Sequence, residues 1–149
     1  KYVDARILDE KLEGLKWITP WYKDDPLKEI SLLKNSIEII KNDNRNKMLI
    51  SNYQFFSFLL EEDLNIPNRW YFRGNHIFPL KGHKHFKFYK KHFNRSIFKN
   101  NIEVIYIVVS IPSGEISIDE FKPYLDNVCF KSENRNSITS SHVLIECKE

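Results

Sequence analysis

The stretch Asn101-Ile102-Glu103-Val104-Ile105-Tyr106-Ile107-Val108-Val109-Ser110 decides the fold, because it is a β-branched apolar run with almost no polar alternation. Such a strand is apolar on both faces and needs structure packed on each side. A helix-like segment precedes it, and another leads into the shorter apolar segment 47–51. Repeated helix-to-strand units indicate an α/β domain. We therefore predict a three-layer Rossmann-like sandwich with a mostly parallel sheet and a C-terminal antiparallel hairpin.

Length and composition favour one compact domain. A chain of 149 residues can bury a sizeable core by itself, so a single α/β domain is expected over residues 1–149. The hydrophobic fraction of 42% excludes a largely disordered chain. With only 4 glycines, a glycine-rich phosphate loop is disfavoured. The net charge of +3 is mild, which argues against nucleic acid as a partner, and nothing indicates an oligomeric state.

Targeting signals are absent from this sequence. No apolar run reaches the roughly 18 residues that span a bilayer, and the N-terminus does not resemble a signal peptide. The chain opens with Lys1, and its single methionine is Met48. We therefore expect a piece excised from a longer membrane protein, whose remainder could supply membrane anchoring and catalysis.

Local signals place the remaining elements. Asp24-Asp25-Pro26 offers an aspartate cap followed by proline at the first helical position, which predicts a helix to Lys41. Further helices are expected at 54–61, 84–98 and 117–125. Strands are expected at 15–19, 47–51, 70–72, 102–109, 127–130 and 142–147, with residues 131–141 as a loose hairpin loop.

The ends of the predicted strands form the first candidate site. In open α/β sheets, ligands gather at the carboxyl ends of the strands. Polar residues follow two predicted strands, and the loop at 68–71 could close over them. The candidate ligand-binding crevice comprises Ser51, Asn52, Tyr53, Asn68, Arg69, Trp70 and Ser110. The alternative, which we favour, is that Ser51 and Asn52 cap the following helix.

A second cluster is rich in histidine and lysine. It contains His76, His83, His85 and His92 together with Lys84, Lys87, Lys90, Lys91 and Arg95. No acidic residue occurs between Asp63 and Glu103, so a metal site is not expected there. The interleaved aromatic residues could support binding of RNA, single-stranded DNA or anionic lipid headgroups. We prefer an amphipathic helix with core aromatics and a solvated lysine face.

A third pattern is Asp126 followed by Glu146-Cys147-Lys148. Metal-dependent nucleases of the PD-(D/E)xK type place an Asp on one strand and Glu-x-Lys on the next, so this pattern is the alternative enzymatic hypothesis. Leu125 stands where that motif has proline. The alternation of residues 143–148 suits an ordinary closing strand, which is the interpretation we favour.

Other motifs are less specific. Cys129 and Cys147 lack metal-site spacing and lie in strand-like segments, where they either pair or remain free thiols. No G-x-S-x-G hydrolase motif is present. Four aromatic rings could stack on a sugar, although we expect most of them to belong to the core: Trp17, Trp21, Tyr22 and Trp70.

Three segments carry a family resemblance: 14–20 (GLKWITP), 50–55 (ISNYQF) and 67–71 (PNRWY). Together they resemble the soluble C-terminal region of uncharacterised bacterial polytopic membrane proteins of the dolichyl-phosphate-mannose (GT-C) glycosyltransferase type. The resemblance implies a membrane-associated, extracytoplasmic (periplasmic) domain. The catalytic acidic residues of that superfamily lie in membrane-proximal loops outside this chain, so none is carried over.

These observations lead to one functional expectation. The chain is expected to be an accessory domain of a membrane-embedded glycosyltransferase-like protein and to be non-catalytic itself. Its expected partners are the transmembrane region of the parent and a glycan or lipid-linked sugar. No catalytic residue, metal ligand or cofactor is assigned. The alternatives are the nuclease and a basic module that binds nucleic acid or an anionic surface.

Overall fold

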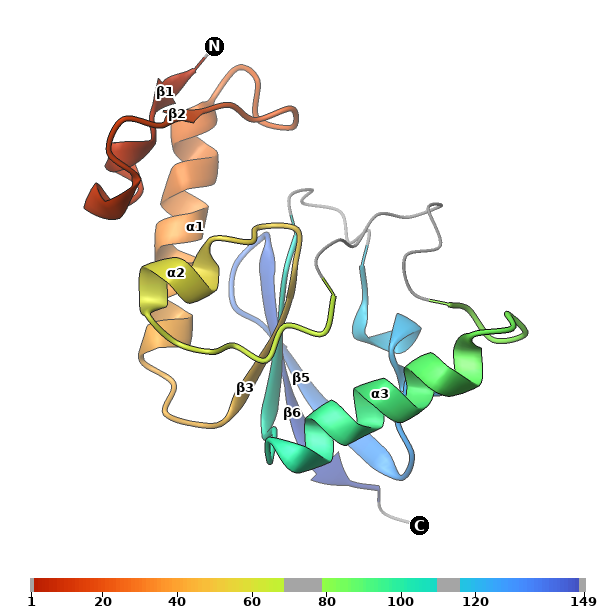
Figure 1. Cartoon of the computed structure of the whole chain (residues 1–149). Helices are drawn as coiled ribbons and strands as arrows, with labels where there is room; N and C mark the ends of the chain where they lie inside the picture. The colour runs from red at the N-terminus through yellow and green to blue at the C-terminus, as the bar shows by residue number, and fades with distance from the viewer. Residues whose placement is uncertain (1, 69–78, 110–115, 148–149) are drawn as a thin grey trace.

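The computed structural model describes residues 2–68, 79–109 and 116–147 (Figure 1). Its α-helices are α1 (Pro26–Lys41), α2 (Phe56–Leu60) and α3 (Phe86–Lys99). Single 3₁₀ turns are η1 (Ala5–Ile7), η2 (Glu10–Leu12), η3 (Ile118–Glu120) and η4 (Lys122–Tyr124). The strands are β1 (Val3–Asp4), β2 (Lys16–Trp17), β3 (Lys47–Ser51), β4 (Val104–Val108), β5 (Val128–Asn134) and β6 (Thr139–Glu146).

The larger sheet has four strands in the order β3-β4-β6-β5, and β1 and β2 form a separate antiparallel pair. Among these described strands β3 and β4 run parallel, whereas β6 is antiparallel to both β4 and β5. The prediction of a three-layer Rossmann-like sandwich with a mostly parallel sheet is therefore wrong. An apolar strand requires cover on both faces, but this requirement does not fix the direction of its neighbours.

β4 is buried on both faces, as its apolar run predicts. Ile105, Ile107 and Val109 enter one core with α3 and the turns η3 and η4. Val104, Tyr106 and Val108 enter a second core with α1 and α2. Figure 1 shows α1 and α2 on one face of the sheet and α3 on the other. The side-chain alternation of one strand therefore divides the apolar interior in two.

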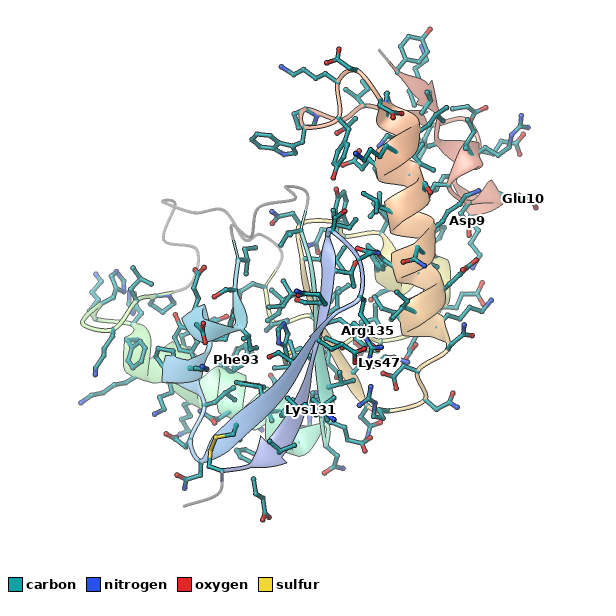
Figure 2. The ribbon with its side chains drawn as sticks, turned by 180° about the vertical axis from the view of Figure 1, so that it is seen from behind. Asp9, Glu10, Lys47, Phe93, Lys131 and Arg135 are labelled. Atoms are coloured by element: carbon teal, nitrogen blue, oxygen red, sulfur yellow. A yellow bond between two sulfur atoms is a disulfide. The ribbon has the colours of Figure 1, made fainter. Side chains whose placement is uncertain are left out.

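The first core is built around aromatic rings. Phe93 of α3, labelled in Figure 2, is fully buried and stacks on Phe121 with 5.7 Å between ring centroids. Tyr124 lies 5.8 Å from the same Phe93 ring. The helix expected at 117–125 is in fact the two 3₁₀ turns η3 and η4, which place Phe121 and Tyr124 against α3.

The passage from α3 into β4 is a Schellman turn. Asn101 adopts a left-handed backbone with φ of 46°, which asparagine tolerates better than most residues. The N–H of Ile102 donates to the carbonyl of Ile97 at 2.9 Å, and that of Asn101 donates to Phe98 at 3.3 Å. These two bonds satisfy carbonyls at the end of the helix and turn the chain toward β4, which begins two residues later.

A polar network holds the turn after α1 against the second core. The buried Tyr106 hydroxyl donates to Asp43 at 2.6 Å, and Arg45 donates to the same carboxylate at 2.6 Å. Burial by itself would raise the pKa of Asp43, but the hydrogen bonds from Arg45 and Tyr106 outweigh it and hold the pKa below its usual range. Burial raises the pKa of Tyr106 to about 12.

The free edge of β3 is covered by the chain that follows α2. The Leu49 N–H donates to the Leu64 carbonyl at 2.9 Å, and the Asn65 side chain donates to the Lys47 carbonyl at 2.9 Å. Lys47, labelled in Figure 2, is itself buried and pairs with Glu62 at 2.8 Å. These contacts occupy groups that an edge strand otherwise leaves unpaired.

The N-terminal segment is held to α1 by a buried carboxylate. Glu29 is 2% exposed and accepts hydrogen bonds from Trp17 Nε1 at 2.8 Å and from the Tyr53 hydroxyl at 2.6 Å. Trp17 also packs edge-on against Phe55 at 5.5 Å. Because a buried carboxylate needs donors to replace water, Glu29 ties both Trp17 of β2 and Tyr53 to α1.

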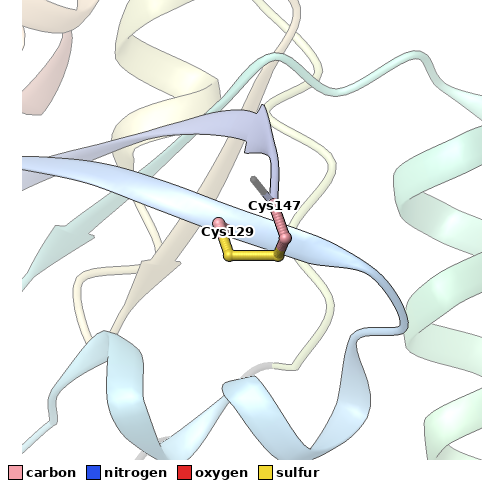
Figure 3. The surroundings of a disulfide bond; sticks show 2 residues. All are labelled: Cys129 and Cys147. Atoms are coloured by element: carbon pink, nitrogen blue, oxygen red, sulfur yellow. A yellow bond between two sulfur atoms is a disulfide. The ribbon is translucent and has the colours of Figure 1, made fainter. Parts of the chain in front are cut away.

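Cys129 and Cys147 form a disulfide with a Cα–Cα distance of 5.0 Å (Figure 3). In the β5–β6 register Cys129 lies opposite Ile145, so the bond reaches diagonally to the residue just after β6. The sequence did not decide whether the two cysteines pair, and the structure shows that they do. The bond closes the far end of the β5–β6 hairpin.

Loss of this bond is expected to destabilise the fold. For a loop of this length, Cys129→Ala/Cys147→Ala should lower the free energy of unfolding by about 2–3 kcal/mol, because the unfolded chain gains freedom. Urea denaturation monitored by circular dichroism measures the change. A reducing agent should destabilise the native protein equally and leave the double variant unaffected. Equal stability of the two proteins would contradict the prediction.

Candidate functional site

Of the predicted strand-end crevice, the structure describes Ser51, Asn52, Tyr53 and Asn68, and it does not bring Tyr53 and Asn68 together. Tyr53 turns toward α1 and bonds Glu29, and the Ser51 hydroxyl accepts from the Tyr53 N–H at 3.0 Å. Ser51 thus caps a turn ahead of α2, and Asn52 is half-buried beside it. The Asn68 amide lies on the other face of the sheet against Tyr89, where it partly offsets the rise that burial causes in the pKa of that phenol. Arg69, Trp70 and Ser110 lie outside the described residues.

A hollow of about 560 Å³ opens at the carboxyl end of β4, toward the tip of the β5–β6 hairpin. Its apolar lining, which we call its floor, consists of Ile107, Val109, Ile116, Ile118 and Ile138, all of them buried. Its polar wall is supplied by Ser117, Ser132, Asn134, Arg135, Asn136, Ser137, Thr139, Ser140 and His142. An apolar base with a few convergent polar groups is the usual composition of a small-ligand pocket.

The hairpin register brings the central polar groups together. Ser132 of β5 lies directly opposite His142 of β6, and Ser140 is two residues from His142 on the same face. His142 Nδ1 is 2.8 Å from the Ser132 hydroxyl, and Nε2 is 2.9 Å from the Ser140 hydroxyl. His142 is 5% exposed, whereas the Ser132 residue is exposed and Ser140 is half-buried. The two hydroxyls therefore face the hollow with the imidazole behind them.

The imidazole of His142 is neutral at neutral pH. Burial lowers its pKa to about 4, although the carboxylate of Asp119 acts in the opposite direction. A neutral imidazole has one N–H donor and one bare acceptor nitrogen. One serine hydroxyl therefore donates to the ring and keeps its oxygen free to accept, while the other accepts and keeps its proton free to donate.

This arrangement suits binding better than catalysis. A general base works best when its pKa lies near the operating pH, and a pKa of about 4 makes His142 a weak base. Both of its ring nitrogens are also occupied by hydroxyls. Among the described lining residues, Arg135 (labelled in Figure 2) is the charged one, and it pairs with Glu133 at 2.9 Å. The hollow therefore offers mainly neutral hydrogen-bonding groups.

The nuclease residues lie at a second hollow of about 560 Å³. Asp126 and Glu146 both line it, together with apolar side chains that include Ile97 and Phe98. The Asp126 carboxylate, however, is paired with Lys90 at 2.5 Å, and Lys148 lies outside the described residues. Within the described ranges no group of three or more His, Cys, Asp or Glu side chains could hold a metal ion. The nuclease hypothesis therefore gains no support from this geometry.

The described residues of the basic cluster lie just before α3 and along it. Lys84, Lys87, Lys91 and Arg95 are exposed, and Lys90 is the member paired with Asp126. His83, His85 and His92 are exposed as well, and the rings of His83 and His85 lie 5.3 Å apart. His76 lies outside the described residues. As an amphipathic helix requires, Phe93 is in the core and Tyr89 packs against it.

Sequence reasoning missed the hollow because it took residues 131–141 for a loose loop. β5 in fact continues to Asn134, and β6 begins at Thr139. Residues 131–142 are almost uniformly polar, so no alternation in the sequence marks the register that places Ser132 opposite His142 and Asn134 opposite Ser140. Of the proposed sugar-stacking aromatics in the described part of the chain, Trp21 is 52% exposed, and none lines the hollow.

Comparison of the chain with protein-family models, curated proteins and solved structures finds no significant similarity. The likeness to a glycosyltransferase-type membrane protein therefore stays a prediction. In the described part of the chain, every helix is too short or too polar to cross a bilayer.

Acidification is expected to weaken the fold through His142. The unfolded chain takes up a proton near the usual histidine pKa of about 6.5, whereas folded His142 takes it up only near 4. Between these values the unfolded state binds more protons, so stability falls as the pH falls through this window. Urea denaturation at about pH 7 and about pH 4.5 should show a smaller loss for His142→Gln than for the native protein.

The exposed His92 provides the matched control. His92→Gln should lose as much stability on acidification as the native protein does, because its imidazole is not buried. An identical loss in His142→Gln and the native protein would show that His142 does not hold a lowered pKa.

Proposed function

We propose that this chain is a non-catalytic binding module whose hollow at His142 takes a neutral, hydroxyl-rich ligand such as a glycan. The observation that carries the proposal is the Ser132–His142–Ser140 group, which presents one hydroxyl as donor and one as acceptor above an apolar floor. A sugar is complementary to this hollow. Its hydroxyls can both donate to and accept from the two serines, and its apolar C–H face can pack on the apolar floor. Neutral lining groups favour such a ligand over an anion or a metal ion.

The setting we propose is outside the cytoplasm, in a membrane-associated protein of the glycosyltransferase type. The disulfide between Cys129 and Cys147 supports the compartment, because such bonds persist in oxidising surroundings. The resemblance of three sequence segments supports the parent protein. In this setting the module would hold a glycan or a lipid-linked sugar for a catalytic centre in the membrane region.

Ligand binding can be tested by titrating the ¹⁵N-labelled protein with neutral hexoses, N-acetylhexosamines and their short oligomers. Amide shifts should concentrate at Ser132, Ser140 and His142. Because a hydroxyl hydrogen bond contributes about 1 kcal/mol, Ser132→Ala or Ser140→Ala should each raise the Kd about fivefold. The exposed Ser31→Ala on α1 is the control and should leave the Kd unchanged.

Two outcomes would contradict the ligand proposal. One is the absence of shifts with every sugar up to the highest soluble concentration, and the other is a set of shifts centred away from the hollow. The parent-protein proposal has a separate test. If the coding region upstream of Lys1 encodes no transmembrane helices, the glycosyltransferase setting fails even if a sugar binds.

A further inference from the structure

Charge is strongly segregated along this chain. Residues 64–102 contain nine of its 23 Lys and Arg residues and none of its 20 Asp and Glu residues. The rest of the chain therefore has 14 cationic and 20 anionic side chains, a net charge of −6. The mild overall charge of +3 conceals a strongly basic segment, and α3 is its helical part.

The fold turns that charge outward on one face. Phe93 and Ile97 of α3 are buried against the sheet, which directs the opposite side of the helix to solvent. The cations on that outer side are Lys87, Lys91, Arg95 and Lys99, and Lys84 lies in the turn just before the helix; all five are exposed. We call this set, with Phe88 and Phe98, the α3 face. Among the described ion pairs, none involves a cation of this face.

Two large apolar side chains project from the same basic surface. Phe88 is 79% exposed and Phe98 is 60% exposed, although the helix has a buried side that could have received aromatic rings. They are ten residues apart, about 15 Å along the helix axis. Leu80, just before α3, is a further exposed apolar residue at 51%. Cations with large apolar side chains between them are the combination that proteins use to lie at a membrane surface.

From this pattern we infer that the α3 face adsorbs to an anionic lipid bilayer. The ammonium and guanidinium groups attract the lipid phosphates, and Phe88 and Phe98 enter the boundary between headgroups and acyl chains. The apolar side of α3 stays in the protein core, so the helix lies on the bilayer without inserting fully. The inference uses no part of the His142 hollow and holds whether or not a sugar binds there.

Single-stranded nucleic acid is the competing polyanion, since aromatic rings among lysines also suit stacked bases. The disulfide disfavours it, because Cys129 and Cys147 remain joined in oxidising compartments, where lipid surfaces rather than nucleic acids are the abundant polyanions. Lysine also predominates over arginine on the α3 face, and a lysine ammonium acts as a point charge for phosphate without bidentate recognition. Charge complementarity and compartment therefore both favour the bilayer.

Vesicle co-sedimentation tests the inference on the whole chain with its disulfide intact. The protein should bind vesicles that contain phosphatidylglycerol, bind pure phosphatidylcholine weakly, and dissociate as salt is raised. Each basic residue near an anionic surface is worth about a fivefold change in partitioning, so Lys84→Gln/Lys87→Gln/Lys91→Gln should weaken binding about a hundredfold. Phe88→Ser and Phe98→Ser should each weaken it severalfold without changing its dependence on salt.

Matched variants on other surfaces provide the controls. Lys23→Gln/Lys28→Gln/Lys34→Gln removes three exposed lysines near and along α1, and Phe58→Ser removes an exposed phenylalanine of α2. Both should bind like the native protein. The inference is overturned if these controls lose as much binding as the α3 variants, or if neutral vesicles bind equally well. Tighter binding to a single-stranded oligonucleotide than to anionic vesicles, through the same lysines, would also overturn it.

Discussion

The alternation of β4 side chains between two separate cores is the constraint on which the rest of the sheet depends. Ile105 and Ile107 require α3 and the turns η3 and η4 on one face, and Val104 and Val108 require α1 and α2 on the other. Because β4 lies between β3 and β6, its backbone groups pair on both edges as well. The one polar group that it buries, the Tyr106 hydroxyl, is satisfied by Asp43.

The hollow exists because the first core ends before the sheet does. Along one face of β5 and β6, Phe130 and Leu144 pack against that core, and the next residues toward the hairpin tip are Ser132 and His142. The side chains along this face therefore change from apolar to polar at Ser132 and His142, beside the apolar floor of the hollow. His142 sits at this boundary, so it is buried enough to remain neutral and is still reached by two hydroxyls that face solvent.

Local features of the fold could be predicted where a few neighbouring residues determine the outcome. Asp25 and Pro26 start α1 as expected, because an aspartate cap and proline at the first helical position act within one turn. The apolar run at residues 104–108 likewise predicts that β4 is buried. Strand direction could not be predicted in this way, since it depends on how distant segments pair. That dependence is why the Rossmann-like expectation is wrong.

The candidate site was less accessible to sequence reasoning. Ser51 ends a strand that the sequence predicts, and Tyr53 follows it. The Tyr53 hydroxyl, however, donates to Glu29 of α1, 24 residues earlier in the chain, whereas Asn68 lies near Tyr89 of α3. The hollow depends on the cross-strand register of Ser132 and His142, which a one-residue shift of the hairpin would destroy. Neither relationship leaves a mark in local composition. The exposed basic side of α3, by contrast, follows from helical spacing alone.

The covered edge of β3 has a consequence for self-association. Leu64 and Asn65 already engage β3, so an incoming peptide finds no continuous row of free donors and acceptors there. At the opposite margin, β5 exposes Lys131 and Glu133, and charged side chains of this kind discourage strand-by-strand stacking. One edge strand of the four-stranded sheet is therefore covered, and the other carries exposed charges. Growth into fibrils or swapped dimers by β-augmentation is disfavoured, and helical or loop surfaces are left as the routes to partners.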